Sequence, residues 1–146
     1  MDRVLLALAI IAVAAVAAAA IRSRRPAPPT QGSWPVPRQV DRGDFEAPDV
    51  PWLLAVFTSS TCESCAMAIE KATVLAGPEV VVVDVPFQTR KDLHQRYGVE
   101  AVPTIVMADA DGVVQVSFVG TPSATDLWAA VAEAREPGSS PEPDLG

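Results

Sequence analysis

Basic residues are scarce in this chain, since 11 Lys and Arg stand against 18 Asp and Glu and give a formal charge of −7. A surface that binds phosphates through overall positive charge is therefore excluded, and with it a nucleic-acid partner. Two cysteines cannot build the bonding framework of a small disulfide-stapled protein. With a single histidine, they also do not form a structural zinc cluster. A length of 146 residues leaves room for one domain of ordinary size but not for two separate cores.

The longest uncharged run lies near the N-terminus. Residues 4–21 are 18 consecutive residues without a charge, nine of them Ala, and as a helix they would span about 27 Å. We therefore predict that residues 1–25 form a single-pass transmembrane anchor with a basic flank. A secretory signal cleaved near Ala18–Ala20 is the alternative. The positive residues directly after the run oppose it: Arg22, Arg24 and Arg25.

The same three arginines predict how the anchor is oriented. Only Arg3 precedes the apolar run, and Asp2 offsets its charge. The flank richer in arginine is expected to stay in the cytoplasm, together with everything that follows it. We therefore predict a membrane protein whose folded domain is cytoplasmic, with the extracytoplasmic face as the alternative.

Proline separates the predicted anchor from the folded part. Residues 26–51 contain seven of the 14 prolines, and we predict that residues 26–35 form an extended Pro-rich linker. Residues 137–146 are predicted to be a disordered tail, because Leu145 is their one large apolar residue. The folded domain is thus predicted at residues 36–136. Residues 44–136 hold five basic and 14 acidic residues, so the acidity of the chain belongs to this domain.

A strand-helix-strand unit is predicted first. Trp52–Thr58 is a continuous apolar run of the kind found in strands that are covered on both faces, and Val80–Val85 is a second, β-branched run. Residues 59–61 offer N-cap hydroxyls for a helix over about residues 62–76, which Gly77-Pro78 would end. A helix between two such strands predicts that they pair in parallel.

The remainder predicts a hairpin between two helices. Arg90–Tyr97 is expected to be a short helix with His94 on its solvated polar side. Thr104–Met107 and Val113–Val119 are expected to be antiparallel strands joined by a turn at residues 109–112. A last amphipathic helix holds Leu127, Trp128, Val131 and Ala134, and Gln39-Val40 is a candidate edge strand. The predicted fold class is α/β, with a small mixed sheet and helices on both faces.

The chemistry is predicted at the C-x-x-C motif Cys62-Glu63-Ser64-Cys65. At the start of a helix, backbone N–H groups and the helix dipole stabilise a thiolate. Cys62 is predicted to be the more exposed nucleophile. Cys65 lies one turn along and faces the core, so it can attack a mixed disulfide formed at Cys62. A pair of small core residues or a static disulfide remains the alternative.

Over about residues 36–135, the sequence resembles the thioredoxin family. Phe57 precedes the cysteine loop as it usually does in that family, Cys62 and Cys65 fill the family's C-x-x-C, and Val102-Pro103-Thr104 looks like its cis-proline motif. The resemblance implies that Pro103, if cis, lies against the cysteines and keeps a metal from settling there. It also implies that this segment binds substrate, with the Val102 backbone pairing with an extended chain.

The departures from the family pattern lie around the cysteines. Thr61 stands where the family usually has Trp, and Glu63-Ser64 replaces its usual Gly-Pro, so these three residues are expected to tune the site. Val56 stands where the family has a buried Asp that accepts protons, and Val80 stands where a Lys often partners that Asp. Slower resolution or a specialised partner is one consequence, and water serving as the acceptor is the alternative. Glu63 also opposes the helix dipole at Cys62.

Two function classes therefore remain open. The first is a membrane-anchored thiol–disulfide oxidoreductase that exchanges disulfides with a protein or small-thiol partner and is recharged by an electron-donating reductase. The second is a redox-inactive binding module, or a protein that binds Cu(I) or zinc through the same cysteine pair. No third ligand lies near the pair in sequence. We expect no cofactor and no metal.

Overall fold

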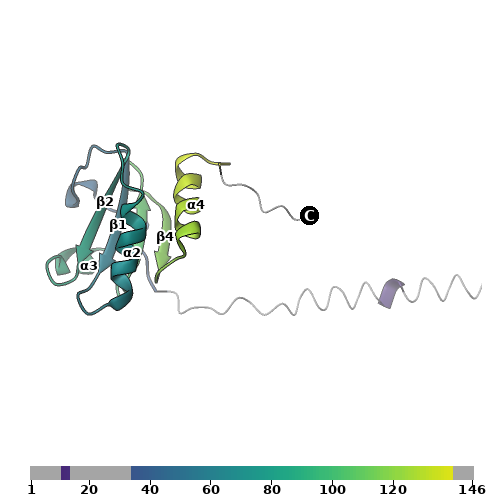
Figure 1. The fold of residues 1–146 in the computed structure, drawn as a ribbon, viewed down its shortest axis with the longest axis horizontal. Helices are drawn as coiled ribbons and strands as arrows, with labels where there is room; N and C mark the ends of the chain where they lie inside the picture. Colours follow the sequence, from purple (N-terminus) through teal and green to yellow (C-terminus); the bar gives the residue numbers. More distant parts are fainter. Residues whose placement is uncertain (1–10, 14–33, 140–146) are drawn as a thin grey trace, which may run out of the picture. The chain divides into compact units, whose positions relative to one another are not determined.

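The computed structural model describes residues 11–13 and 34–139, and the chain divides into two units, residues 1–33 and 34–146. The second unit holds the helices and strands drawn in blue to yellow in Figure 1. In chain order these are η1 (Arg42–Asp44), β1 (Trp52–Thr58), α2 (Glu63–Thr73), β2 (Val80–Pro86), α3 (Lys91–Arg96), β3 (Thr104–Ala108), β4 (Val114–Val119) and α4 (Ala124–Arg135).

The strands form one mixed sheet in the order β2-β1-β3-β4. β1 pairs in parallel with β2, because α2 connects the two, and the other neighbours pair antiparallel. β1 thus lies inside the sheet, and each of its residues after Trp52 is buried. This burial explains why the sequence of β1 is apolar without alternation. The predicted central strand at Trp52–Thr58 and its parallel pairing are confirmed.

One face of the sheet is covered by α2 and α4. Side chains of both helices pack against alternate residues of the inner strands, which point to the same face because the side-chain period of a strand is two. Figure 1 shows α2 in front of the sheet, running roughly along its strands, and α4 beside β4. The buried members of this cluster are Leu54, Val56, Ala68, Ala72, Val80, Ile105, Met107, Leu127 and Val131.

The opposite face is covered by α3 and by the segment that precedes β1. Val40, Phe45 and Leu93 pack there against Leu53 and Phe57 of β1. Arg42 holds the segment in place, because its buried guanidinium donates hydrogen bonds to the backbone carbonyls of residues 50, 51 and 109. The expected mixed sheet with helices on both faces is therefore confirmed.

The turn between β3 and β4 forms as the sequence predicts. Gly112 has a φ of 79°, and the carboxylate of Asp109 accepts hydrogen bonds from the backbone N–H groups of Asp111 and Val113. The expected edge strand at Gln39-Val40 is reduced to one isolated bridge between Gln39 and Val113. Val40 N–H also donates to the carbonyl of Gly112 at 2.8 Å, so the N-terminal segment closes over the turn.

His94 corrects the sequence analysis, which expected it on a solvated face. Its side chain is 3% exposed, and its Nε2 lies 2.7 Å from the carbonyl oxygen of Val85. It packs edge-on against the rings of Phe57 and Phe87, with centroids 5.1 and 5.3 Å away. The prediction was wrong because His94 directly follows the buried Leu93, and both side chains of this short helix turn onto the sheet face that carries Phe57 and Val85.

α2 is shorter than predicted at its C-terminal end. It ends at Thr73, before Gly77-Pro78, and the chain continues through turns at Leu75 and Ala76. Met67 and Val74 on its outer side are 51% and 66% exposed.

The predicted anchor lies outside the described residues except for residues 11–13, which are helical. Within residues 11–13 and 34–139, no helix is both long enough and apolar enough to cross a membrane. The predicted linker and tail likewise fall largely outside these ranges and stay predictions.

Candidate functional site

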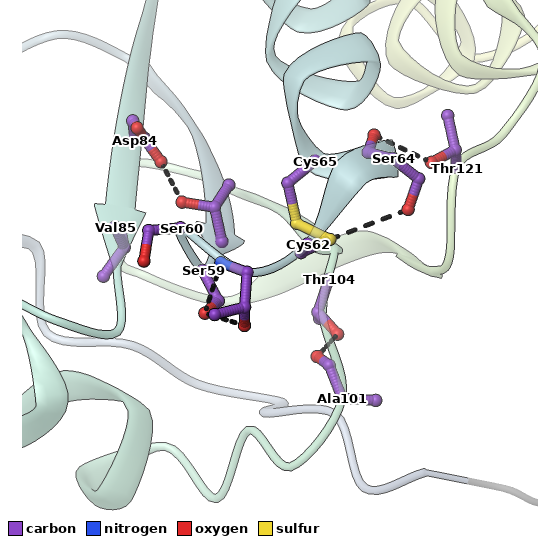
Figure 2. Close-up of a disulfide and its surroundings, with 12 residues drawn as sticks. Ser59, Ser60, Cys62, Ser64, Cys65, Asp84, Val85, Ala101, Thr104 and Thr121 are labelled. Atoms are coloured by element: carbon purple, nitrogen blue, oxygen red, sulfur yellow. Dashed lines mark hydrogen bonds between the residues drawn. A yellow bond between two sulfur atoms is a disulfide. The ribbon is translucent and has the colours of Figure 1, made fainter.

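The two cysteines lie at the connection between β1 and α2 and are joined by a disulfide (Figure 2). Their Cα atoms are 5.4 Å apart. Cys62 is the N-cap of α2, and no side-chain hydrogen bond caps the helix, so the expected capping by residues 59–61 is wrong. Instead, these residues form a turn in which the Cys62 N–H donates to the carbonyl of Ser59. The structure thus represents the oxidised state of the pair.

The two sulfur-bearing residues differ in exposure. Cys65 faces the core and is 4% exposed, whereas Cys62 is only partly buried. The motif spacing produces this difference, because a helix places residue 65 on the inner face while residue 62 sits at its open end. A partner can therefore reach Cys62 but not Cys65.

Cys62 occupies the N-terminal end of α2, where the first backbone N–H groups of a helix have no partner within it. In the reduced state, they and the helix dipole favour a thiolate on Cys62 over a thiol. The Ser64 hydroxyl lies 3.6 Å from the Cys62 sulfur, within the range of a weak hydrogen bond to sulfur. Glu63 is in the first turn of α2 and is exposed, so water screens its charge from the sulfur.

Gln88 holds the turn before the cysteines, and the sequence analysis did not identify it. Its Oε1 accepts a hydrogen bond from the N–H of Ser60 at 3.1 Å, and its Nε2 donates to the hydroxyl of Ser59 at 3.0 Å. The Ser59 and Thr61 hydroxyls lie 3.1 Å apart. The loop after β2 thereby fixes the loop after β1. No sequence signal pairs these two loops, because the contact depends on the parallel register of the strands.

The segment with Pro103 joins the site from β3. The Val102-Pro103 peptide is cis, as the resemblance implies. Thr104 is 1% exposed, and its hydroxyl donates to the carbonyl of Ala101 at 2.7 Å. Within residues 11–13 and 34–139, the backbone of Val102 makes no hydrogen bond, and this residue is partly exposed. A main-chain edge is therefore open there.

Residues 120–122, which follow β4, tie this segment to α2. The Gly120 N–H donates to the carbonyl of Pro103 at 2.8 Å, and the Thr121 hydroxyl donates to the carbonyl of Ser64 at 3.3 Å. The Lys71 ammonium donates to the carbonyl of Pro122 at 2.8 Å. The predicted cysteine pair and the predicted substrate segment are thus brought together by long-range hydrogen bonds that the sequence pattern does not show.

A groove of about 480 Å³ opens beside the disulfide. Its walls are mainly hydroxyl, amide and apolar groups, and Asp84 is the one charged side chain among them. The Thr58 hydroxyl donates a hydrogen bond of 2.6 Å to Oδ1 of Asp84. The lining residues are Thr58, Ser59, Ser60, Cys62, Cys65, Ala66, Ile69, Asp84, Pro86 and Gln88.

Asp84 was missed, although the sequence contains a signal for it. It interrupts the apolar run Val80–Val85. As an alternate residue of the strand, it points to the same face as Val80 and Val82, both of which pack beneath α2. It is also the register partner of Val56 on β1. Val56 is fully buried and apolar, so Asp84 stands on the neighbouring strand beside the position where the resemblance implies a buried Asp.

No group of three or more His, Cys, Asp or Glu side chains in the described part of the chain could hold a metal ion. A disulfide also leaves neither sulfur available as a thiolate ligand. The site thus combines a disulfide that can exchange, a main-chain edge open to a further strand, and a groove with one carboxylate.

Comparisons with known proteins agree with this geometry. Residues 40–135 match the family model described as a thioredoxin-like domain. The chain is 36% identical over 86 residues to a probable thioredoxin of Methanothermobacter thermautotrophicus, covering 57% of this chain and 95% of that protein. A probable thioredoxin of Methanothermobacter marburgensis is 35% identical over 83 residues, covering 55% of this chain and 92% of that protein.

Solved structures show the same fold. A mutant thioredoxin from Halobacterium salinarum superposes with a TM-score of 0.53 at 27% identity, covering 60% of this chain and 78% of that one. The germline-specific thioredoxin Deadhead from Drosophila melanogaster gives a TM-score of 0.54 at 23% identity, covering 62% of this chain and 88% of that one.

Proposed function

Because the chain belongs to the family of thioredoxin-like domains, we propose that it is a thiol–disulfide oxidoreductase whose reactive pair is Cys62 and Cys65. The observation that supports this most directly is the asymmetric pair itself. A reachable sulfur at a helix N-terminus is disulfide-bonded to a buried sulfur one turn along. A purely structural disulfide has no need of either the exposed position or the open main-chain edge beside it.

The proposed reaction begins with the reduced pair. The Cys62 thiolate attacks one sulfur of a substrate disulfide, the substrate S–S bond breaks, and the displaced thiolate leaves and takes up a proton. Cys65 loses its proton and attacks the Cys62 sulfur. The mixed disulfide breaks, the Cys62–Cys65 bond forms, and the second substrate thiol is released. Two electrons pass from the protein to the substrate, and an electron-donating reductase or thiol restores the dithiol.

The substrate is proposed to lie along Val102, Pro103 and Thr104. The free N–H and C=O of Val102 supply a main-chain edge for an extended chain, as strands do when they accept an additional partner. Residues 120–122 hold this edge beside the start of α2. Specificity for a protein or small-thiol disulfide then depends on the groups around Cys62.

The residues between and before the cysteines are proposed to tune the pair. The Ser64 hydroxyl is placed to donate to a Cys62 thiolate, which favours its formation. Glu63 acts only weakly in the opposite direction, because water screens its exposed charge, and Thr61 orders the preceding turn through its contact with Ser59. Val56 is apolar and fully buried, so the position where the resemblance places a proton-accepting Asp supplies no carboxylate for the proton of Cys65.

We further propose that residues 1–25 anchor the domain to a membrane and that the domain faces the cytoplasm, where it acts as a reductant. The charge pattern around residues 4–21 supports this proposal. A tether raises the concentration of the domain near membrane-bound partners. Protease treatment of sealed right-side-out vesicles tests this orientation. A cytoplasmic domain is protected from the added protease and is cleaved only after the vesicles are lysed.

The deciding experiment uses the full chain in mild detergent with Cys62→Ser and Cys65→Ser, and Ser117→Ala, an exposed serine of β4 outside the groove, as a control. Equilibration with dithiothreitol of defined potential should give a reversible two-electron couple in the wild-type protein. Cys65→Ser should accumulate a mixed disulfide with an offered substrate, whereas Cys62→Ser should neither form one nor turn over. Thiols that do not exchange, or full turnover in Cys62→Ser, would refute the proposal.

A further inference from the structure

The groove beside the disulfide has a charge that the exchange reaction does not use. Asp84 is exposed and lines the same groove as Cys62 and Cys65, whose other walls carry no ionisable side chain apart from the two cysteines. Figure 2 shows Asp84 and Ser60 to the left of the disulfide, Thr121 to its right, and Thr104 and Ala101 below it. A partner disulfide at Cys62 therefore has the main-chain edge on one side and a carboxylate on the other.

The fold fixes this carboxylate in place. β2 runs parallel to β1 in the register that sets Asp84 beside Val56, on the face covered by α2. The Thr58 hydroxyl, itself buried, donates to Oδ1 at 2.6 Å and restrains the carboxylate. A carboxylate accepts about four hydrogen bonds, so most of its capacity remains for a ligand in the groove.

No Lys or Arg in the described part of the chain forms an ion pair with this group. Among the described residues, the ion pairs of Asp and Glu with Lys or Arg involve other carboxylates, and none includes Asp84. The hydroxyl and amide groups of Ser59, Ser60 and Gln88 complete a polar wall without a positive charge. A ligand that reaches this groove thus gains most if it brings the cation itself.

We propose that Asp84 selects disulfide substrates that carry Lys or Arg one or two residues from the attacked cysteine. The inference rests on the proposed oxidoreductase function and names its substrate class. An extended chain advances about 3.3 Å per residue, so the Cα of such a Lys or Arg lies only about 3 to 7 Å along the chain from that of the attacked cysteine. From there its long side chain can turn into the groove. The excess of acidic residues in the domain adds attraction at longer range.

The same carboxylate has one competing role, as proton acceptor for Cys65. The observations favour recognition, because Asp84 is exposed and its one hydrogen bond within the described residues goes to Thr58 rather than to a cysteine. The two roles predict different kinetics. Recognition changes rates according to the charge of the substrate, whereas proton transfer changes all rates in the same direction.

The test measures second-order reduction rates of three short peptide disulfides by the reduced full chain at low ionic strength. The peptides differ at one residue next to the cysteine, which is Lys, Gln or Glu. Uncharged hydroxyethyl disulfide reports the exchange chemistry. The variants are Asp84→Asn, Asp84→Glu, and Glu70→Gln as a control that removes one exposed charge from α2 outside the groove.

We expect the wild-type protein to reduce the Lys peptide about 3- to 10-fold faster than the Glu peptide, the range for a partly exposed to a charge-assisted pair. Asp84→Asn should slow the Lys peptide and speed the Glu peptide, so their ratio falls toward one. Asp84→Glu should keep part of the ratio, and Glu70→Gln should retain nearly all of it.

Three results would overturn the inference. An unchanged Lys-to-Glu ratio in Asp84→Asn assigns the preference to the overall charge of the domain. An equal loss for all three peptides assigns Asp84 to proton transfer. If the wild-type protein fails to reduce even hydroxyethyl disulfide, the proposed function itself is wrong, and the substrate class falls with it.

Discussion

The turn at Gly112 allows one prediction to be worked quantitatively. A Cβ added at Gly112 would lie 2.0 Å from the carbonyl oxygen of Val40, and the residue has a φ of 79°. Gly112→Ala therefore combines backbone strain with a clash that only backbone movement can relieve. That movement separates the Val40 N–H from the Gly112 carbonyl, now 2.8 Å apart.

Two other glycines separate these contributions. Gly120 has a φ of 92° with no atom within 4 Å of an added Cβ, and Gly77 has equal space without a positive φ. Gly120→Ala should thus cost only the strain, about 1–2 kcal/mol. Gly112→Ala adds the clash and the lost hydrogen bond, for a total of about 2–4 kcal/mol. Gly77→Ala should be neutral or stabilise by up to about 1 kcal/mol, because it restricts the unfolded chain.

Urea unfolding of the full chain in mild detergent, followed by tryptophan fluorescence, measures this series. With an m-value of about 1.5 kcal/mol/M, the midpoint of Gly112→Ala should fall by about 1–3 M. The urea midpoint of Gly120→Ala should fall by about 1 M, and that of Gly77→Ala should not fall. The reasoning is refuted if Gly112→Ala is as stable as Gly120→Ala, since the close approach of Val40 would then have no energetic effect.

Two further predictions concern the opposite face of the sheet. His94→Leu keeps the volume but removes the bond from Nε2–H to the Val85 carbonyl, and it should lower the unfolding free energy by about 1–3 kcal/mol in urea titrations; an unchanged midpoint would show that the bond contributes nothing net. Burial, followed by the hydrogen bond to Asp44, raises the pKa of Tyr97 to about 12 from 10.0. The folded pKa is above the unfolded one, so this stability is full below about pH 10 and is lost as pH rises toward about 12. Tyr97→Phe should weaken the decline of the urea midpoint over that window, and an identical decline in both proteins would contradict this.

The sheet could be predicted from the sequence because its inner strands are buried on both faces. Trp52–Thr58 shows that burial as an unbroken apolar run, so its bounds and central place follow directly. The turn at residues 109–112 is equally local, since the Asp109 carboxylate and Gly112 supply its hydrogen bonds and its positive φ. Local chemistry of this kind is present in the sequence itself.

Contacts between segments that are distant in the sequence were harder to predict. Periodicity placed His94 on the polar side of α3, but its burial depends on contacts with the Val85 carbonyl and the Phe57 ring, which periodicity does not show. The cysteines were found from their spacing, whereas Asp84 and Gln88 enter the groove through the register of β1 and β2. A polar residue that interrupts a β-branched run was a usable signal for Asp84, because each alternate residue of that run is packed.

The hydrogen bonds around residues 120–122 determine which substitutions this part of the chain can tolerate. All three acceptors, at Pro103, Ser64 and Pro122, are main-chain carbonyl oxygens. Every amino acid supplies that atom, so replacements at these acceptor positions leave the acceptor in place. Inheritance of this scaffold therefore constrains the donors Thr121 and Lys71 and the length of the segment more than the identity of the residues it holds.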